Sequence, residues 1–539
     1  MQGVGILPNP SRRSCPMARS AQTRRRRRPR PHAIHKPNGV IQPRVQAVGP
    51  EHFGILSVDC AKARSKFMLA DFYGRVLIPP TTSEHNQAGL QAAVRLLHEA
   101  LDRHGIRDHI VAVERTGRYH GPAQRAFGEA GSEVRIVHPF TTKQFRQAAD
   151  PGNKTDDTDL SAIHRAAVNG FGLLEPEPDP LYVRLQLLAR HRRDLVGKRV
   201  AIQQQMHEHL QSFMPGYAKC FDDVFESALA VCVATSFGSA PAIVTAGLPG
   251  LAGRLRQAGL RTHAPTLEKI LAWARQAPLP QEPAALHHRF FVELDADRLS
   301  RIRRVAALEC ELVEQLVLTP YVLLMGVPGI NVVSAAEFAG EMGPIRHYAR
   351  ANAITGRAGL FPSRYQSDAV DHRAGALVRC ANHDLRRAIM IISENLIKCN
   401  DYFRVLAAGW KQRGKDPRAT TVKVAGRFCR IAYHVVAGGT TYRHPCSQHR
   451  DYILDKLIKF STEHDIPSDQ LVRDLDAAVA RLPRSAHREE AAALAEELGR
   501  VQAKRGAGPK RLGEILPAVL AKLGVHTVES KPSGETDPA

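Results

Sequence analysis

The stretch "FGILSVDCAKARSKFMLADFYGRVL" (residues 53–77) decides the fold, because it reads as a strand, a short polar turn and two further strands. A helical pattern follows over 87–103, and "HIVAVERTG" (109–117) is another short apolar strand that ends in a polar turn. Next come a helix that ends at Gly131 and the strand "SEVRIVHP", which stops at Pro139. Strands alternating with helices predict an α/β sheet with helical cover.

Four carboxylates lie at the ends of these predicted elements. Asp59 ends the first strand and Glu114 ends the fourth. The segment "GNKTDDTDLSAI" (152–163) begins a helix on which Asp156 and Asp159, three positions apart, share one face. We therefore expect these four side chains to form one group.

Each acid alone has an ordinary explanation, as a turn residue, an exposed strand end or a helix start favoured by the helix dipole. Asp157 is interpreted in this way, as a solvated side chain. The set of four matches a chemical need, because two divalent ions require several hard carboxylates that converge from rigid elements. The four carboxylates are accordingly candidates for a metal site.

The composition predicts a polyanionic partner. Lys and Arg outnumber Asp and Glu by 75 to 53, which gives a formal net charge of +22 over 539 residues. Half of this excess lies in residues 1–50, which contain ten Arg, one Lys and no acid and are predicted to be a basic disordered arm. Basic side chains gain affinity for nucleic acid by releasing counterions from phosphates, although solubility alone also favours a charged surface.

Several features favour a cytoplasmic protein without a membrane part. The nine cysteines are scattered without framework spacing, which predicts reduced thiols. The stretch "TRRRRRPRPH" (23–32) lacks the apolar segment of a signal peptide. Residues 227–253 carry no charge, but Pro and Gly interrupt them, so a buried or loop-rich segment is expected rather than a membrane span.

Two long helical patterns, from Leu181 and over roughly 294–318, keep apolar residues at heptad-like spacing. Arg192 and Arg199 interrupt the first pattern. The two heptad-like patterns predict a coiled-coil arm, formed between chains or folded back as a hairpin. The predicted organisation is a basic arm (1–50), an α/β domain (51–175), coiled-coil helices (176–215 and 293–319) around an insert (216–292), a mainly α domain (320–445) and a charged helical tail (446–539).

The mainly α domain contains a second set of candidate residues. The segment "GVPGINVVSAAEFAGEMG" (326–343) is either a helix-hairpin-helix-like contact to phosphate or an ordinary turn between helices. Beyond it, Ser363 and Ser367 lie among arginines, which are suited to bidentate phosphate binding. A serine in a basic loop is more often a phosphate contact or part of a solvated turn than a nucleophile, because its hydroxyl needs activation. The predicted nucleic-acid contacts are Lys154, Arg364, Arg373, Arg379, Arg386 and Arg387.

Both sets of motifs resemble one protein family. "VDCAK", "VERTG", "VHP" and "NKTDDTDLSAI" together resemble the N-terminal domain of the insertion-sequence 110 family of transposases, also called DEDD transposases, whose fold is RuvC/RNase H-like. "VPGIN", "GLFPSRYQSD" and "ANHDLRR" resemble the C-terminal transposase domain of that family. The resemblance covers roughly 54–215 and 293–438. The family's acidic positions fall on Asp59, Glu114, Asp156 and Asp159.

The resemblance implies a chemistry for these residues. The four carboxylates bind Mg²⁺, and Ser367, which matches the family's catalytic serine, attacks DNA to form a phosphoserine link. A hydroxyl of another strand then reverses the link. An element-encoded guide RNA pairs with donor and target DNA, and a homo-oligomer, a dimer or tetramer, contributes the two halves of the active site from different protomers. Asp368 and Asn331 stand where the family has glycine.

Two other functions fit the sequence. A metal-dependent, structure-specific DNA nuclease, similar to a Holliday-junction resolvase, needs only the carboxylates and a metal-activated water, with Ser367 as a phosphate contact. An inactive nucleic-acid-binding relic is the third hypothesis, and the anionic Asp368 beside Ser367 is the feature that favours it.

Overall fold

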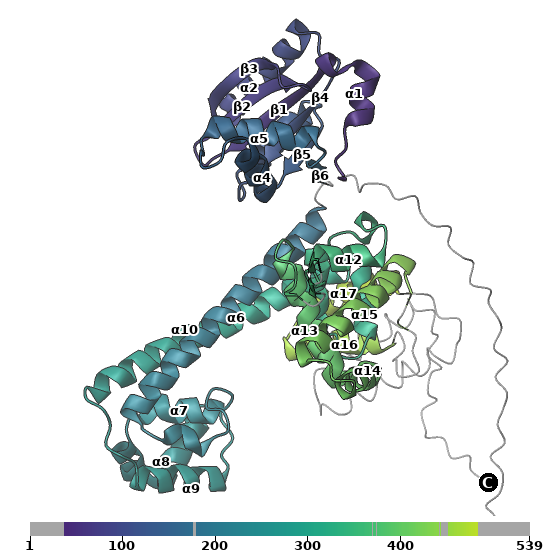
Figure 1. Cartoon of the computed structure of the whole chain (residues 1–539). Coiled ribbons are helices and arrows are strands. Elements are labelled where there is room, and N and C mark those ends of the chain that lie inside the picture. Colours follow the sequence, from purple (N-terminus) through teal and green to yellow (C-terminus); the bar gives the residue numbers. More distant parts are fainter. Residues whose placement is uncertain are drawn as a thin grey trace, which may run out of the picture. The chain divides into compact units, whose positions relative to one another are not determined.

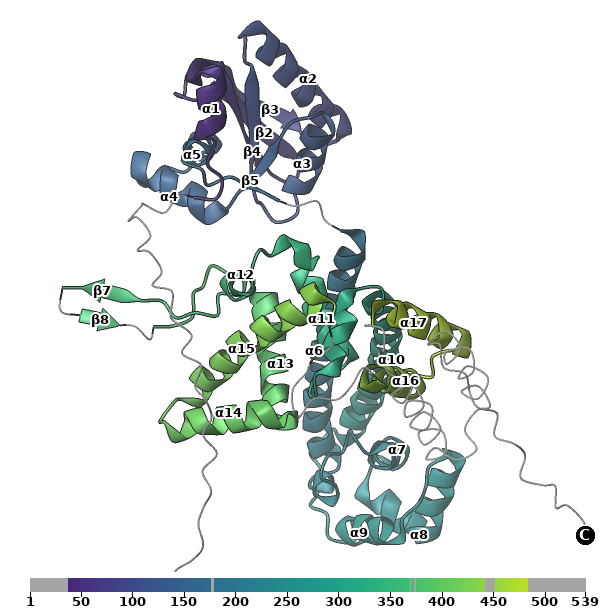
Figure 2. The same ribbon diagram turned by 90° about the vertical axis from the view of Figure 1, so that its right-hand side faces the viewer.

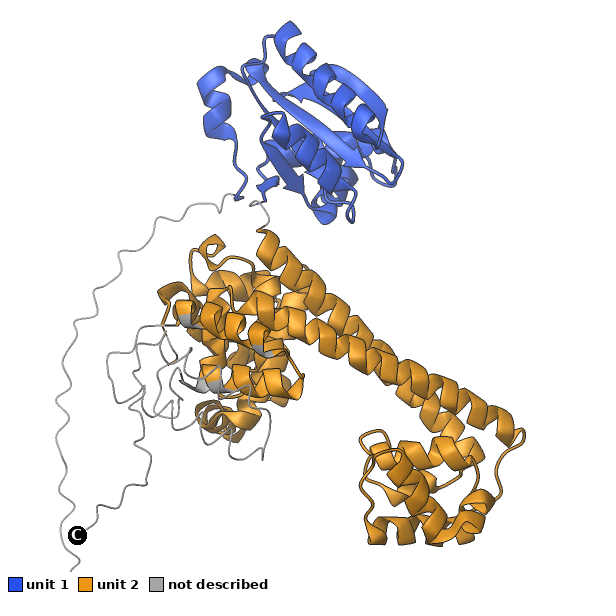
Figure 3. Cartoon of the chain, turned by 180° about the vertical axis from the view of Figure 1, so that it is seen from behind, with its two compact units in different colours: residues 1–176 blue, residues 177–539 orange. Residues whose placement is uncertain are grey.

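The computed structural model describes residues 37–175, 179–368, 370–372, 375–440, 442 and 451–482. The chain divides into two compact units, residues 1–176 and residues 177–539, which are described separately (Figures 1 and 3). The first unit is a mixed α/β domain and the second is mostly helical. The predicted succession of an α/β domain and a mainly helical region is thus confirmed.

A six-stranded sheet forms the centre of the first unit. β1 pairs with β4, and β4 with β5, in parallel, whereas the other three pairings are antiparallel. The first three strands therefore form a meander, and the parallel strands follow helical crossovers. The strand order is β3 (Val76–Glu84), β2 (Arg64–Asp71), β1 (Phe53–Cys60), β4 (Asp108–Glu114), β5 (Val134–Val137) and β6 (Leu173–Leu174).

Helices cover both faces of this sheet. They are α1 (Gln42–Val48), α2 (Gln87–Arg103), α3 (His120–Glu129), α4 (Pro139–Ala149) and α5 (Asp156–Val168). On one face, α2 and α3 pack against Leu56 and Val58 of β1. On the other, α5 packs against Phe53 and Ile55. Because successive strand residues point to opposite faces, Asp59 lies on the α5 side.

The predicted disordered arm over 1–50 is wrong at its C-terminal end. Ile41 and Val45 are buried in the same apolar cluster as α5, because their four-residue spacing places both on one side of α1. Arg44 of the same helix pairs with Asp108, with 2.6 Å between Nη2 and Oδ1. The domain therefore begins before residue 50, and residues 1–36 of the predicted arm lie outside the described residues.

The arm of the second unit is a hairpin of two long helices, α6 (Pro180–Phe213) and α10 (Ala284–Leu316) (Figure 3). They pack along each other within one chain, which is the folded-back alternative of the predicted coiled coil. Arg192 is accommodated in their contact because its Nε lies 2.5 Å from Oε1 of Glu309. The second helix begins at Ala284, so the predicted end of the insert at 292 is too late.

The insert between these helices forms a small helical cluster. Its elements are η2 (Tyr217–Cys220), α7 (Ala228–Phe237), α8 (Ala240–Gln257) and α9 (Ala264–Arg275). They share an apolar core with the adjoining ends of α6 and α10. Among the described residues, no single helix has the length and apolar character needed to cross a membrane; one bent pair, α7 with α8, meets that requirement by length and composition.

The remaining helices of the second unit pack around one large apolar core (Figure 2). An exposed two-stranded hairpin, β7 (Tyr365–Ser367) and β8 (Val370–His372), belongs to the same part of the chain. The helices are η3 (Pro320–Gly326), α11 (Val332–Met342), η4 (Ile345–His347), α12 (Ala351–Arg357), α13 (His383–Cys399), α14 (Asp401–Gln412), α15 (Pro417–Gly438), α16 (Asp451–Glu463) and α17 (Ser468–Arg481).

The predicted boundary at 445 is also wrong, because α16 and α17 belong to this core. Ile453 and Leu457 of α16 are buried in it. Lys456 projects between them into the turn before α11, where its Nζ donates to the carbonyl of Met325 at 2.7 Å and to that of Ile330 at 2.5 Å. The sequence showed the helical, charged character of this segment but not its contribution to the core. Residues 483–539 lie outside the described residues.

The turn at 328–330 matches the ordinary-turn interpretation. Lys456 donates to the Ile330 carbonyl in this turn and to the Met325 carbonyl before it, and Gly329 adopts φ +96°. Asn331, which replaces the second glycine of the family motif, begins α11 by accepting a hydrogen bond from the Ser334 backbone N–H at 2.9 Å. The side chain of Ser334 in turn accepts from the Asn331 backbone N–H at 3.0 Å. This reciprocal cap satisfies the backbone N–H groups of Asn331 and Ser334 at the start of α11.

Replacing Ile41 with alanine tests the corrected start of the domain. Because Ile41 is 0% exposed, Ile41→Ala should lower the free energy of unfolding of the first unit by about 2–5 kcal/mol. Pulse proteolysis of the full chain across a urea series would measure this change. Gln46→Ala, at an exposed position of the same helix, is the matched control. Equal stability of the two variants would show that the segment before residue 50 is not part of the folded domain.

Candidate functional site

Two of the predicted carboxylates emerge side by side from neighbouring parallel strands. Val58 of β1 lies opposite Val113 of β4 in the ladder, so the next residues, Asp59 and Glu114, follow at the same edge of the sheet. Both point to the face that α5 covers, because they continue the alternation of Phe53 and of the other residues buried there. Parallel pairing therefore brings together two acids that are 55 positions apart in the sequence.

The start of α5 brings the other two carboxylates to this edge. Thr155 caps the helix through its side chain and shares a capping box with Thr158, which fixes the direction in which the first turn leaves the loop. Asp159 is 5% exposed, whereas Asp156 is exposed. The helix packs directly on β1 and β4.

The negative charges at this edge of the sheet act on the pKa values of Asp59 and Glu114. Burial raises the pKa of Asp59, and the negative charges of Asp159 and Asp156 raise it further. Burial also raises the pKa of Glu114 to about 7, with the Asp59 charge as the next cause. Lys154 opposes both increases, so its cation also faces this group. The arrangement gathers negative charge that the described side chains only partly neutralise.

Two basic residues that were not among the predicted site residues neutralise part of this charge. Arg146 of α4 forms an ion pair with the buried Asp159. Lys66 of β2 lies 2.5 Å from Oδ1 of Asp157, through its Nζ atom. Asp157 is thus exposed, as expected, but it is also paired. No sequence motif points to Arg146. Predicting Lys66 would have required knowledge of the β1–β2 register, in which Lys66 lies opposite Asp59.

These residues fit a divalent cation by donor chemistry. Hard carboxylate oxygens are the ligands that Mg²⁺ prefers, and the mutual repulsion of the acids is what a cation would relieve. In this conformation, no three acidic, His or Cys side chains of the described residues are arranged as a metal-ligand group. Asp159 is held instead by Arg146. Arg146 contacts Oδ1 of Asp159, so a cation bound by all four acids would use the other oxygen of Asp159 or displace Arg146.

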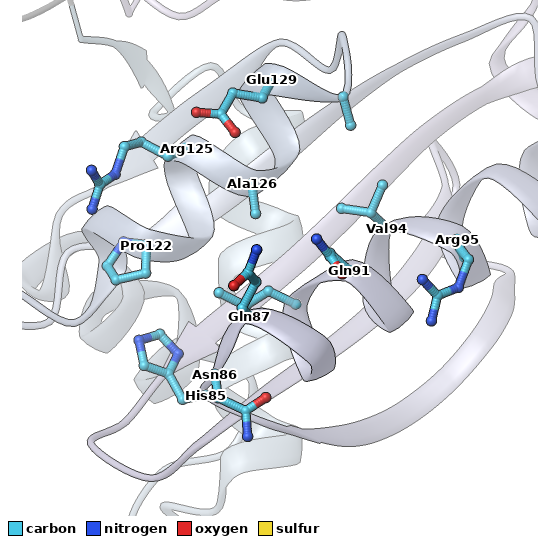
Figure 4. A pocket seen from close by; sticks show the side chains of 12 residues that line it. His85, Asn86, Gln87, Gln91, Val94, Arg95, Pro122, Arg125, Ala126 and Glu129 are labelled. Carbon is cyan, nitrogen blue, oxygen red and sulfur yellow. The ribbon is translucent and has the colours of Figure 1, made fainter.

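A pocket of about 730 Å³ in the first unit lies on the other face of the sheet, between α2 and α3. Gln87 and Gln91 project from α2 towards Ala126 of α3, and Arg95 and Arg125 lie at its sides (Figure 4). Because Asp59 and Glu114 point to the α5 face, this pocket is separate from the carboxylates.

The predicted serine lies on the exposed hairpin of the second unit. Ser367 ends β7, and its neighbour Asp368 adopts φ +47°, a left-handed conformation that favours glycine and tolerates Asp. This conformation explains a glycine at that position in the family pattern. Arg364 and Asp371 join the two strands through a bidentate ion pair, with Nε–Oδ1 at 2.8 Å and Nη2–Oδ2 at 2.9 Å. The hairpin therefore presents an exposed serine, while Arg364 is held by its ion pair with Asp371.

Ser363 and Arg386 have structural contacts near the base of this hairpin. Ser363 donates its hydroxyl to the Ala376 carbonyl at 3.0 Å. Arg386 donates to the Ala358 carbonyl at 2.8 Å and to that of Val378. Both serines are exposed, and Ser363 differs in that its hydroxyl is bonded to a backbone carbonyl.

The other predicted cations of the second unit differ in their surroundings. Arg379 and Arg387 are exposed, so they remain candidates for contacting phosphate. Arg373 lies outside the described residues.

A buried carboxylate, which no sequence motif indicated, joins α11 to α6 and to the residue before α13. Glu341 of α11 is 4% exposed. Arg190 of α6 donates to both of its oxygens, at 2.7 and 3.0 Å, and Asn382 donates to Oε2 at 3.2 Å. Asn382, from the motif "ANHDLRR", also caps α13. The motif "ANHDLRR" therefore has a structural function, whether or not it also takes part in catalysis.

Removing Arg146 tests whether it balances the buried charge of the site. With divalent ions chelated, Arg146→Met should lower the local free energy of opening of α5 by about 3–5 kcal/mol, because Asp159 would be left buried and unpaired. Hydrogen exchange of the α5 amides would measure the loss. Lys143→Met, at an exposed position of α4, should change it by no more than about 0.5 kcal/mol. Unchanged protection in Arg146→Met would contradict the pairing.

The raised pKa of Glu114 predicts a pH dependence of stability. The folded state retains the Glu114 proton up to about pH 7, whereas the unfolded chain releases it near 4.5. The unfolded state thus binds fewer protons in this window, so stability falls as the pH rises through it. Chemical denaturation in chelator, between pH 4.5 and pH 7, should show a larger decline for the wild type than for Glu114→Gln. Parallel declines would contradict the raised pKa.

Two segments of the chain match family models. Residues 56–215 match a DEDD model of the insertion sequence IS110 described as "Transposase", and residues 321–407 match the "Transposase IS116/IS110/IS902 family". A relative from Streptomyces clavuligerus, "Insertion element IS116 uncharacterized 44.8 kDa protein", is 26% identical over 238 residues. That match covers 43% of this chain and 58% of the relative, so the chain spans less than two thirds of it. The two matched segments contain both sets of predicted residues and are similar to transposases of the IS110/IS116/IS902 family.

Proposed function

We propose that the protein is a transposase that cuts and rejoins the DNA strands of an insertion sequence. The observation that carries this proposal is the convergence of Asp59, Glu114 and the start of α5 at one sheet edge, inside a segment that matches a transposase model. The strand order, with β1 between an antiparallel meander and two parallel strands, supports a RuvC/RNase H-like fold for this unit. Phosphoryl transfer on DNA is the chemistry that such carboxylates serve.

Asp59, Glu114, Asp156 and Asp159 would hold Mg²⁺. Bound there, the ion would supply positive charge to a scissile phosphate and relieve the repulsion that raises the pKa of Glu114. The chain's own groups set the conditions for this chemistry. Asp59 and Glu114 are half-buried, the α5 cap holds the helix start in place, and Lys154 would attract the phosphate.

The second part of the proposed reaction uses Ser367. Its hydroxyl loses a proton as the Oγ–P bond forms, and the bond from phosphorus to one deoxyribose oxygen breaks, with that oxygen taking up a proton. A hydroxyl of another DNA strand then attacks the phosphoserine and restores the serine hydroxyl. The exposure of Ser367 supports this function, and the exposed Arg379 and Arg387 would bind the phosphate. No net hydrolysis occurs, so the phosphodiester energy is kept.

The partners follow from the same proposal. Donor and target DNA are the substrates, and the +22 charge is suited to holding DNA together with a guide RNA encoded by the element. Ser367 and the carboxylates belong to different units of the chain. A homo-oligomer, a dimer or tetramer, could thus pair the serine of one protomer with the carboxylates of another. The protein would act in the cytoplasm.

Replacing Ser367 with alanine tests the proposal. Purified protein is incubated with Mg²⁺, RNA from the flanking non-coding DNA, and labelled DNA that spans the element junction. The wild type should yield a slow-migrating DNA species that protease removes on a denaturing gel, and Ser367→Ala should yield none, because it lacks the attacking oxygen. Ser363→Ala, which loses only a hydroxyl bonded to the Ala376 carbonyl, should still form the adduct.

The other outcomes separate the alternative functions. Free cleaved ends that persist in Ser367→Ala would contradict the recombinase and favour a metal-dependent nuclease. Binding without cleavage in any of the proteins would favour an inactive nucleic-acid-binding protein.

A further inference from the structure

Two adjoining hollows follow α15 in the second unit, with volumes of about 550 and 400 Å³. Arg427 and Arg430 line both, so the hollows form one groove. Tyr402 and Trp410 of α14 line the larger hollow, and His434 lines the smaller. Helices α14 and α15 lie beside each other (Figure 2). We call this feature the α14–α15 groove.

One side of the groove is basic. Lys423, Arg427, Arg430 and His434 follow one another at spacings of four, three and four residues, so they share one face of α15. All four are exposed. Among the described residues, none that lines either hollow is an acid. The groove therefore favours an anionic ligand with several charges in a row.

The other side of the groove is aromatic, and each ring has a cation over it. The Nζ of Lys423 lies 5.4 Å from the ring centre of Trp410, and the guanidinium carbon of Arg427 lies 5.8 Å from that of Tyr402. Arg427 also donates to the Tyr402 hydroxyl at 2.9 Å. Both rings are half-buried and pack against the large core, which fixes their position. Rigid rings beside cations are the elements with which proteins bind unstacked bases and their phosphates.

The floor of the groove has room for such a ligand. Gly426 lines it, and a Cβ atom built there would have no other atom within 4 Å. Leu360, also in the lining, lies seven residues before Ser367 in the same segment of chain. The groove is thus directly connected to the loop that leads to the proposed nucleophile.

We propose that the α14–α15 groove binds an unpaired stretch of nucleic acid. A base takes the place of the cation over Trp410 or Tyr402, and Lys423, Arg427 and Arg430 pair with the adjacent phosphates. A duplex fits the groove less well, because its stacked bases do not expose their faces to the rings. The inference rests on the proposed function only in that a recombinase handles separated DNA strands. It adds the place on this chain where one such strand is bound.

The test uses the full chain and a labelled thymidine homopolymer of about 16 nucleotides, which falls in the size range of single-strand sites. Binding is followed by anisotropy. Gly426→Gln fills the groove without removing a charge and should weaken binding by roughly 5- to 100-fold, the range expected when one stacked base is lost. Gly253→Gln is the control, because Gly253 lies in α8 of the insert with equally open surroundings.

Two further measurements locate the ligand. The chain has two tryptophans, so Trp273→Phe leaves Trp410 as the sole indole, and its emission should be quenched on binding. Arg427→Gln and Arg430→Gln should each reduce the slope of log affinity against log salt by about 0.7, the contribution of one phosphate on a single strand. Equal affinities of Gly426→Gln and Gly253→Gln, unquenched Trp410, or equal competition by a duplex of the same length would overturn the proposal.

The result is independent of the serine chemistry. Ser367→Ala should bind the strand like the wild type if the groove is the site. Strand binding in the groove without any protein–DNA adduct would reject the recombinase and keep the groove. Adduct formation that Gly426→Gln leaves unchanged, with unchanged strand affinity, would reject the groove and keep the recombinase.

Discussion

Parallel pairing of β1 with β4 is the constraint on which the candidate site depends. It places Asp59 and Glu114 at the same edge and on the same face of the sheet, and α5 adds Asp159 to that face. Burial raises the pKa of Asp59 and of Glu114, and the negative charges around them raise both pKa values further. The Arg146 contact to Asp159 and the nearby Lys154 limit this repulsion without removing it. The fold therefore maintains an unfavourable charge arrangement where a cation would be useful.

In the second unit, a buried carboxylate is surrounded by hydrogen-bond donors. Glu341 is as inaccessible as Asp159, but two nitrogen atoms of Arg190 and the amides of Gln186 and Asn382 surround its oxygens. A carboxylate with this many donors contributes to structure, because each of its oxygens is satisfied. Among the described residues, Asp59 and Glu114 have no such set of donors. Acids with perturbed pKa values in a folded protein are a reason to expect a functional site there. This difference distinguishes Glu341, which has a structural function, from Asp59 and Glu114, which are candidates for a functional site.

Much of the first unit could be predicted from the sequence, because local patterns determine it. The helix expected over 87–103 is α2, with the same limits, and the strands of 53–77 appear in the expected order. Arg146 was missed because its partner depends on how α4 packs against α5, which no spacing reveals. Ile41 was missed because two apolar residues within a basic segment give a weak signal, although the sheet buries them completely or nearly so.

In the second unit, tertiary contacts decided what the sequence left open. The turn at 328–330 is held in part by Lys456, more than a hundred residues later, which donates to the Ile330 carbonyl and to the Met325 carbonyl before the turn. The folded-back arm was one of two alternatives, and the buried Arg192–Glu309 pair is part of what holds it. The positive φ of Asp368 could not be read from the residue type alone, since Asp occurs in many turns.

The hairpin of α6 and α10 has a consequence for the segment it carries. The backbone N–H of Gln281, just before α10, donates to the carbonyl of Ser212 near the end of α6 at 2.8 Å. The two ends of the insert are thus adjacent, and the paired helices have already closed the loop. Lengthening a loop whose ends are fixed costs little entropy. The insert can therefore be exchanged, shortened or enlarged in evolution as a separate module, while the proposed chemistry of the two matched segments remains in place.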